Sequence, residues 1–197
     1  MILGRSFYLR EDVVSIAREL ICKYIVTTFN GELTSGMITE TEAYEGITDK
    51  ASHAFGGRNT ARTEVMYRQG GTAYVYLCYG MHSLFNIVTN YNSTPHAILI
   101  RGFRPMEGID VMERRMGRKV GKKSFANGPG KVSKALGIHY SMSGVDLCYA
   151  MAHKKENRIW VEDRGILPSE AEILITPRIG IAYAGKDALL PYRFLLK

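Results

Sequence analysis

The sequence predicts an α+β fold, a single domain over residues 1–197 built around a twisted, mainly antiparallel β-sheet with flanking helices. Segments that alternate apolar and polar residues, or that are rich in β-branched and aromatic residues, outnumber the segments with helical spacing. An Asn-Gly pair at 30–31 lies between two of the alternating segments and indicates a tight hairpin. A chain of 197 residues is also long enough to enclose one hydrophobic core.

The first half of the chain is expected to hold a helix followed by a hairpin. Apolar residues recur at helical spacing over residues 11–22, which predicts a helix. Residues 22–29 alternate like a strand, and Asn30-Gly31 then turns the chain into a return strand at 33–44. Residues 45–63 are polar and rich in glycine, so we expect a long ordered loop there.

The second half is expected to add most of the sheet. Further strands are predicted at 72–79, 84–90, 96–103, 158–163 and 171–176. Two helices are predicted at 105–117 and 131–137, the second ending at Gly137. The basic, glycine-rich stretch 118–130 between them is expected to be a surface loop.

Composition argues against several classes of protein. No apolar run is long enough to cross a bilayer, and the N-terminal residues lack the pattern of a signal peptide. We therefore expect an intracellular protein that is not secreted and has no membrane partner. Cys22, Cys78 and Cys148 are scattered, and the five histidines form no HxxxH or HExxH pair. Neither a disulfide framework nor a metal site is expected.

The charge indicates an anionic partner. The formal net charge is +7 and the isoelectric point is about 9.3, a balance common in proteins that bind a polyanion. Basic residues gather at Arg114, Arg115, Arg118, Lys119, Lys122 and Lys123. A solvated surface loop without a partner would show the same charge, so composition alone leaves both possibilities open.

The segment ETEAY at 40–44 could carry acid–base chemistry. Side chains on a strand alternate between its two faces, so Glu40, Glu42 and Tyr44 would share one face, together with Ile38. Two carboxylates beside an aromatic ring could form an acid–base site. Ordinary exposed acids on an edge strand would give the same pattern.

A run of tyrosines could bind nucleobases. Tyr74 and Tyr76 would share a face of their strand, and Tyr79 precedes a turn at Gly80. Aromatic rings stack on bases, and a ring at a turn can wedge between base pairs. A tyrosine-rich strand that packs in the core is the alternative.

Two glycine-containing segments could hold phosphates. In HAFGGRNTAR, residues 53–62, Arg58 and Arg62 flank an amide and a hydroxyl. In NGPGK, residues 127–131, glycines precede a predicted helix whose first turn contains Lys131, and helix N-termini bind anions. Neither segment has the spacing of a Walker loop or a dinucleotide fingerprint. Structural loops with surface charges remain the alternative.

Together these segments resemble the alkyladenine (N-methylpurine, or 3-methyladenine) DNA glycosylase family. The matching segments are ETEAY at 40–44, His53 with GGRNTAR at 56–62, YVYLCYGM at 74–81, Asn86, LIRG at 99–102, GPGK at 128–131 and RIGIAYAG at 178–185. They cover most of the chain and follow the order of the family.

The resemblance implies how the reaction would proceed. A damaged purine would be flipped out of duplex DNA, and its N-glycosidic bond would be hydrolysed in base-excision repair. The catalytic carboxylate of the family falls on Glu42 rather than on Glu40. The arginine that positions the attacking water falls on Arg101, and the backbone carbonyl that also holds this water falls on Ile179.

The resemblance also implies how the substrate would be bound. The pocket that stacks on the flipped base falls on Tyr44, His53 and Tyr76. The asparagine that crowds the exocyclic amine of normal guanine falls on Asn86. The residue that fills the gap left by the flipped nucleotide falls on Tyr79.

The expected partner is double-stranded DNA containing damaged purines, bound through its phosphates by Arg58, Arg62 and Lys131. The resemblance implies an enzyme that acts as a monomer without a cofactor or metal. The matched pocket contains no lysine, so we expect a monofunctional enzyme that leaves the abasic strand uncut. An RNA base-modifying enzyme and a non-catalytic binder of damaged DNA are the alternatives.

Overall fold

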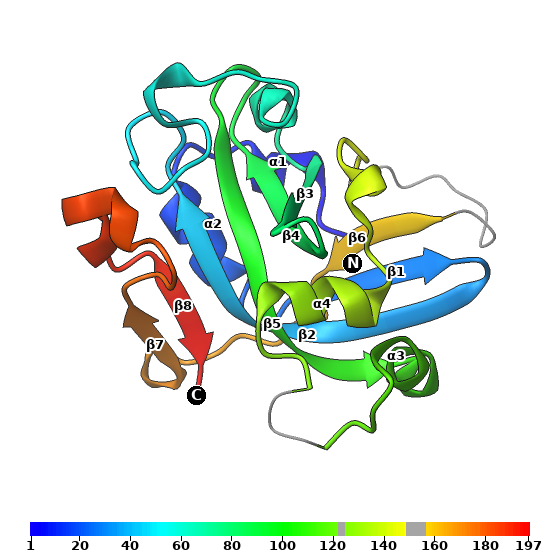
Figure 1. Ribbon diagram of the computed structural model, residues 1–197. Coiled ribbons are helices and arrows are strands. Elements are labelled where there is room, and N and C mark those ends of the chain that lie inside the picture. Colours follow the sequence, from blue (N-terminus) through cyan, green and yellow to red (C-terminus); the bar gives the residue numbers. More distant parts are fainter. Residues whose placement is uncertain (122–124, 149–156) are drawn as a thin grey trace.

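The computed structural model describes residues 1–121, 125–148 and 157–197, so Lys122 and Lys123 of the basic cluster lie outside the described residues. An eight-stranded, antiparallel sheet forms the centre of the fold, in the order β3-β4-β5-β2-β1-β6, with β8 pairing with both β2 and β7 (Figure 1). The strands are β1 (Tyr24–Phe29), β2 (Glu32–Tyr44), β3 (Ala73–Cys78), β4 (His82–Thr89), β5 (His96–Glu107), β6 (Arg158–Glu162), β7 (Ile173–Thr176) and β8 (Arg193–Leu196). The predicted α+β class is confirmed.

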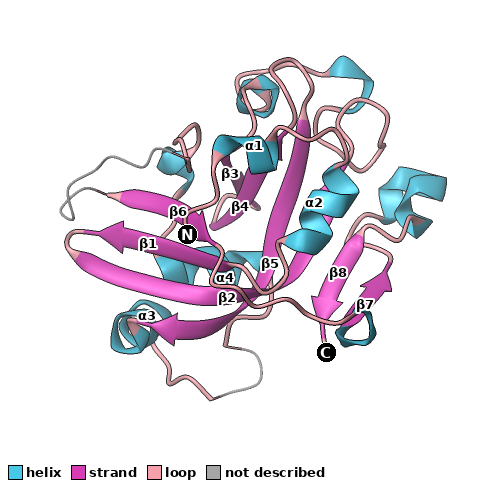
Figure 2. Ribbon diagram, turned by 180° about the vertical axis from the view of Figure 1, so that it is seen from behind, coloured by secondary structure: helices cyan, strands magenta, loops and turns pink. Residues whose placement is uncertain are grey.

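Helices flank this sheet on both sides. The α-helices are α1 (Arg5–Tyr8), α2 (Val13–Glu19), α3 (Ile109–Met116) and α4 (Pro129–Leu136). Short 3₁₀ helices lie at Phe55–Gly57, Glu64–Tyr67, Tyr140–Met142, Glu170–Glu172 and Ala182–Leu189. Helix α4 lies in front of β2 and β5 in Figure 1, and α2 lies in front of the same strands in the opposite view of Figure 2, so the two helices cover opposite faces. Within the described residues, no helix is both long and apolar enough to span a bilayer.

The first predicted elements form where the sequence placed them: α2 and β1 are shorter than predicted, and β2 begins one residue earlier, at Glu32. Asp12 caps α2 because its carboxylate accepts the backbone N–H groups of Val14 and Ser15. Asn30 and Gly31 have φ angles of 53° and 80° and join β1 to β2. Positive φ at both central residues is the mark of the turn that Asn-Gly favours, so the predicted hairpin is confirmed.

The predicted helix at 105–117 is wrong at its start. Strand β5 continues to Glu107 because Glu107 still pairs with Ser35 of β2, and only after Gly108, at φ 68°, does α3 begin. Pairing between distant strands outweighs the local helical pattern there. The second predicted helix starts earlier than expected, at Pro129, and it ends at Gly137 as predicted.

Two irregularities in the pairing of β2 with β5 shape the centre of the sheet. The register shifts between Ile38 and Glu40 and again between Glu40 and Thr41. Such bulges re-aim side chains and are common beside active sites. Ile38, which we expected beside the carboxylates, packs in the main core instead. Arg101 lies opposite the second shift, because Glu40 pairs with Gly102 and Thr41 pairs with Ile100.

Candidate active site

A row of paired residues across four strands forms the floor of a pocket. Glu42 of β2 pairs with Leu99 of β5, Leu99 pairs with Asn86 of β4, and Asn86 pairs with Tyr74 of β3. Residues that pair directly across a sheet present their side chains on the same face. All four line a pocket of about 400 Å³, which also receives side chains from the loop after β2 and from residues 179–183.

One end of the pocket holds a buried carboxylate surrounded by donors. Glu42 is fully buried, and its Oε1 accepts the backbone N–H of Ile179 at 2.9 Å. Its Oε2 accepts the Tyr44 hydroxyl, also at 2.9 Å, and its Oε1 lies 3.5 Å from Arg101 Nε. Burial and the adjacent Glu42 raise the pKa of Tyr44 well above 10, so its hydroxyl stays protonated and donates. A carboxylate has about four acceptor positions, so these three donors leave one position on Glu42 without a partner from among them.

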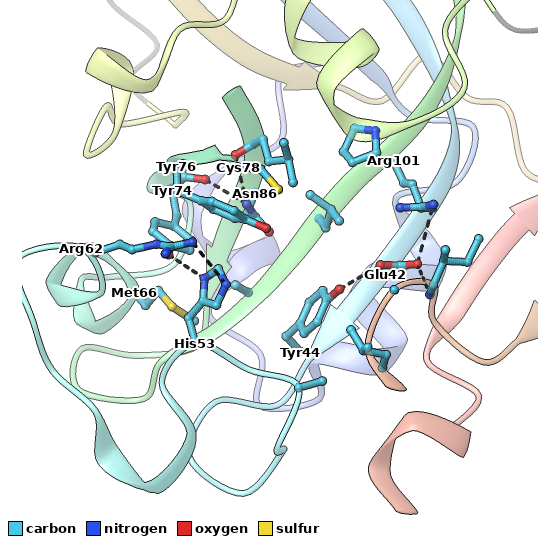
Figure 3. A pocket seen from close by; sticks show the side chains of 18 of the residues that line it. Glu42, Tyr44, His53, Arg62, Met66, Tyr74, Tyr76, Cys78, Asn86 and Arg101 are labelled. Carbon is cyan, nitrogen blue, oxygen red and sulfur yellow. Dashed lines mark hydrogen bonds and ion pairs between the residues drawn. The ribbon is translucent and has the colours of Figure 1, made fainter. Parts of the chain in front are cut away.

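Two carboxylates share Arg101. Its Nε lies 2.9 Å from Glu40 Oε1 and 3.5 Å from Glu42 Oε1, and Glu40 also accepts from Arg193 Nε at 2.6 Å. Glu40 is 5% exposed. The guanidinium of Arg101 is therefore fixed between the two acids, with the bulge in the strand pair directing it into the pocket (Figure 3).

The other end of the pocket is aromatic. The His53 and Tyr76 rings lie 4.6 Å apart between centroids, edge to face, and the Tyr74 hydroxyl lies 2.9 Å from His53 Nδ1. Burial lowers the pKa of His53 to about 4, helped by the charges of Arg62 and Arg58, so its imidazole is neutral at physiological pH. Figure 3 shows His53 and Tyr76 at one end of the pocket, and Tyr44 between them and Glu42.

Tyr44 rests on a buried ion pair. The Arg178 guanidinium lies 4.8 Å from the Tyr44 ring centroid and is bonded through both terminal nitrogens to Asp49. Both charged side chains are almost completely excluded from solvent. Burial alone would lower the pKa of Arg178, but its pairing with Asp49 outweighs burial and raises it. Because Ile179 follows Arg178, the same ion pair fixes the backbone N–H that binds Glu42.

Asn86 is 4% exposed and has a fixed orientation. Its side-chain nitrogen donates to the carbonyl oxygens of Tyr74 and Leu84, at 3.2 Å each. Both donor hydrogens are used in this way, so the side-chain oxygen is the group left to meet a ligand.

Tyr79 is the most exposed of the large hydrophobic side chains that line the pocket, at 89%. It forms the tip of the β3–β4 hairpin together with Gly80, and both residues have positive φ angles, 50° and 69°. A backbone conformation of this kind is uncommon for a tyrosine. A groove that contains Tyr79, His82, Lys131 and Lys134 starts at this tip and follows the N-terminal end of α4.

The three residues predicted to bind phosphates lie at different places relative to the pocket. Arg58 is exposed on the loop after β2, and Lys131 is half-buried in the groove beside Tyr79. Arg62 lines the pocket instead, with its guanidinium 4.8 Å from the Tyr76 ring centroid and its Nη2 3.5 Å from His53 Nε2.

The structure thus brings most of the predicted site residues to one pocket. Among the predicted residues, Arg58 and Lys131 lie outside the pocket, and those that line it are Glu42, Tyr44, His53, Arg62, Tyr76, Tyr79, Asn86, Arg101 and Ile179. At Ile179 the backbone N–H contacts Glu42, whereas the resemblance implied a role for the backbone carbonyl. The roles implied by the resemblance stay predictions.

Sequence reasoning missed the residues that support the site. Glu40 and Tyr74 were predicted to share a face with Glu42 and Tyr76, a signal that could have placed both at the site. Arg178 and Asp49 carried no such signal, because 129 positions separate them in the chain. Among the described residues, no group of three or more His, Cys, Asp or Glu side chains is arranged to hold a metal ion.

Comparison with known sequences agrees with this site. Residues 6–197 match the methylpurine-DNA glycosylase (MPG) family. A Chlamydia felis protein named "Putative 3-methyladenine DNA glycosylase" is 44% identical over 195 residues, which cover 98% of this chain and 95% of that protein. Proteins of the same name from Clostridium perfringens and Carboxydothermus hydrogenoformans are 40% and 42% identical and cover the whole of this chain, with 96% of each relative aligned. The chain therefore belongs to the methylpurine-DNA glycosylase family.

Proposed function

We propose that this protein, a 3-methyladenine-type DNA glycosylase of base-excision repair by family, uses Glu42 to activate the water that attacks the sugar of a flipped, damaged purine nucleotide. The observation that carries the proposal is the position of Glu42. A fully buried carboxylate at one end of a pocket whose other end is aromatic is suited to a purine bound with its sugar next to the acid.

The contacts of Glu42 support a general-base role. All three groups that contact Glu42 are hydrogen-bond donors, namely Ile179 N–H, the Tyr44 hydroxyl and Arg101. They orient the carboxylate and do not compete with it for the proton of the attacking water. A positioned base accelerates such a reaction by about 10²–10⁴-fold. The same negative charge would stabilise the oxocarbenium-like sugar as the bond breaks. Arg101, fixed by Glu40, would orient the water.

The remaining contacts would select the substrate. The flipped purine would stack between Tyr44 on one side and His53 with Tyr76 on the other. The side-chain oxygen of Asn86 would crowd the exocyclic amine of normal guanine. Methylated adenine and guanine, hypoxanthine and ethenoadenine are all candidate bases.

Access to the base requires flipping, which costs a few kcal/mol and less for a damaged pair. We propose that Tyr79 occupies the gap, because its ring projects from the hairpin tip next to the pocket mouth. Arg58 and Lys131 would bind phosphates on either side. In the described part of the chain no lysine lines the pocket, which supports a monofunctional reaction without strand cleavage.

The test is excision from a duplex that carries one hypoxanthine or ethenoadenine, in EDTA, followed by hot alkali to reveal abasic sites. We expect alkali-dependent cleavage with the wild type and at least a 100-fold loss with Glu42→Gln. The matched control is Glu64→Gln, an exposed glutamate outside the pocket, which should cleave at the wild-type rate. Unchanged excision by folded Glu42→Gln would overturn the assignment, and alkali-independent nicking would overturn the monofunctional reaction.

A further inference from the structure

The guanidinium of Arg62, a cationic group of the protein, lies at the aromatic end of the pocket. Its guanidinium lies 4.8 Å from the centroid of the Tyr76 ring, and its Nη2 lies 3.5 Å from His53 Nε2 (Figure 3). A guanidinium has no acceptor, so the His53 Nε2 lone pair faces it, and the Nδ1–H then donates to the Tyr74 oxygen. Arg62 therefore uses both the ring face and the lone pair that this end of the pocket offers to a cationic ligand.

No carboxylate of the described residues fixes Arg62 in this position. Over the ranges that the structure describes, none of the ion pairs involves Arg62, and the residue is exposed. Arg101 and Arg178, the other two arginines at the site, are each paired with a buried carboxylate. A guanidinium on a half-buried ring such as that of Tyr76 is attracted by about 0.5–2 kcal/mol, whereas a charge-assisted bond to a phosphate is about twice as strong as a neutral hydrogen bond.

A cationic purine would compete with Arg62 for the same place. Alkylation at a ring nitrogen gives the base of a nucleoside a positive charge, and such a base would stack on Tyr76 through the same attraction that holds the guanidinium. Two like charges on one ring face, in a partly desolvated pocket, repel each other. A neutral purine such as ethenoadenine meets no such repulsion.

The loop that carries Arg62 also faces DNA in the proposed function. Arg58, four residues earlier, is exposed on the same loop, and the pair was predicted from sequence to hold phosphates. A long, exposed side chain that is not held by an ion pair can reach toward a phosphate without a change in the fold.

We propose that Arg62 determines specificity by base charge: in the free protein it occupies the Tyr76 ring face and excludes cationic purines, and on duplex DNA it moves to a backbone phosphate and opens that face. The inference rests on the proposed function, because it assumes that the pocket binds flipped purines. Through this movement of Arg62, the pocket binds a charged, alkylated base that is part of DNA and excludes the same base in a free nucleoside.

The first measurement is nucleoside binding without DNA. Ethenoadenosine is neutral and fluorescent, so it can be titrated directly, and 7-methylguanosine, kept cationic at mildly acidic pH, can be measured by competition against it. We expect Arg62→Gln to bind 7-methylguanosine about 2- to 30-fold more tightly than the wild type, with a smaller change for ethenoadenosine. Arg62→Lys keeps the charge and should still exclude the cation.

The second measurement is binding to a duplex with one ethenoadenine at several salt concentrations. Loss of a phosphate contact lowers the slope of log affinity against log salt by about one, so Arg62→Gln should show that decrease. Arg68→Gln is the matched control, since Arg68 is exposed, pairs with Glu64 and lies outside the pocket. It should change neither the slope nor nucleoside binding.

The outcomes separate this inference from the proposed function. If both nucleosides bind and Arg62→Gln changes their affinities by the same factor, or leaves both unchanged, Arg62 does not select by charge. An unchanged salt slope would show that it does not move to a phosphate. If neither nucleoside binds to any folded variant, the pocket is not a purine site, and the proposed function fails together with the inference. Arg62→Ala is the substitute should Arg62→Gln not fold.

Discussion

The buried pair of Arg178 and Asp49 gives a prediction whose size follows from the structure. Asp49→Ala would leave the Arg178 guanidinium, whose side chain is 0% exposed, without its counter-ion. Removing one partner of a buried pair costs about 3–5 kcal/mol, because the other charge stays buried and uncompensated. Arg178 would keep its hydrogen bonds to the carbonyls of Ala43 and Asp187, so we expect a value near the lower end.

A chain of this length loses about 2–4 °C of melting temperature per kcal/mol, so the expected decrease is roughly 6–20 °C. Thermal unfolding followed by circular dichroism, supported by urea titration, would measure it. Glu170→Ala is the control, because Glu170 pairs with Arg18 at the surface and is 84% exposed in its side chain. Exposed pairs contribute about 0–1 kcal/mol, so this variant should melt close to the wild type.

A double replacement tests whether the stability is lost because the charge of Arg178 stays buried without its counter-ion. Replacing a buried ion pair by apolar residues of similar size is often neutral or stabilising. Asp49→Leu combined with Arg178→Met should therefore recover most of the lost stability. It should not recover excision, since the segment that presents Ile179 N–H to Glu42 would lose its anchor. If Asp49→Ala melts no lower than Glu170→Ala, the pair does not stabilise the site and the argument fails.

Two further predictions concern the two ends of the pocket. Glu40→Gln removes the closer of the two acids that fix Arg101, so excision should slow about 10-fold, a loss of ~1.4 kcal/mol, with little change in the KM for DNA. An equal rise in KM with kcat unchanged would refute the positioning role. For His53, the folded pKa of about 4 lies below the unfolded value near 6.5, so the unfolded chain binds the proton first. Stability should therefore fall as pH drops from about 6.5 to 4, and His53→Gln should weaken that dependence in urea titrations. An equal slope of unfolding free energy against pH in the wild type and in His53→Gln would contradict this role of His53.

The fold was predictable where short-range patterns agree with the sheet. Alternation and the Asn-Gly turn predict the β1–β2 hairpin, and Gly137 predicts the end of α4. Strand β8 was not predicted, because it has only four residues and exists through pairing with β2 and β7. The extension of β5 to Glu107 was missed for the same reason, since its partner Ser35 lies far away in the chain.

The candidate site was predictable as far as each residue lies in a recognisable motif. Alternation places Glu42 and Tyr44 on one face, and the resemblance selects Glu42 rather than Glu40. Sequence could not show that Glu40 fixes Arg101, because that contact depends on a bulge between two strands. It also assigned Arg62 to phosphates only, since nothing local to the loop indicates that Tyr76 lies within reach.

The three arginines of the site differ in how their charge is balanced, and this difference is the reason that our proposal of a switch concerns Arg62. Arg101 lies between Glu40 and Glu42, and Arg178 is paired with Asp49, so each of these charges is compensated inside the protein. Moving Arg178 would leave Asp49 without its counter-ion, and moving Arg101 would leave the fully buried Glu42 without one, each at a cost of several kcal/mol. Of the three, Arg62 can leave the pocket without exposing such a charge, because it contacts the Tyr76 ring, His53 and the Tyr74 hydroxyl and pairs with no carboxylate of the described residues. A phosphate that takes Arg62 away removes one positive charge from the aromatic end, which is the change that a cationic base requires in order to stack there.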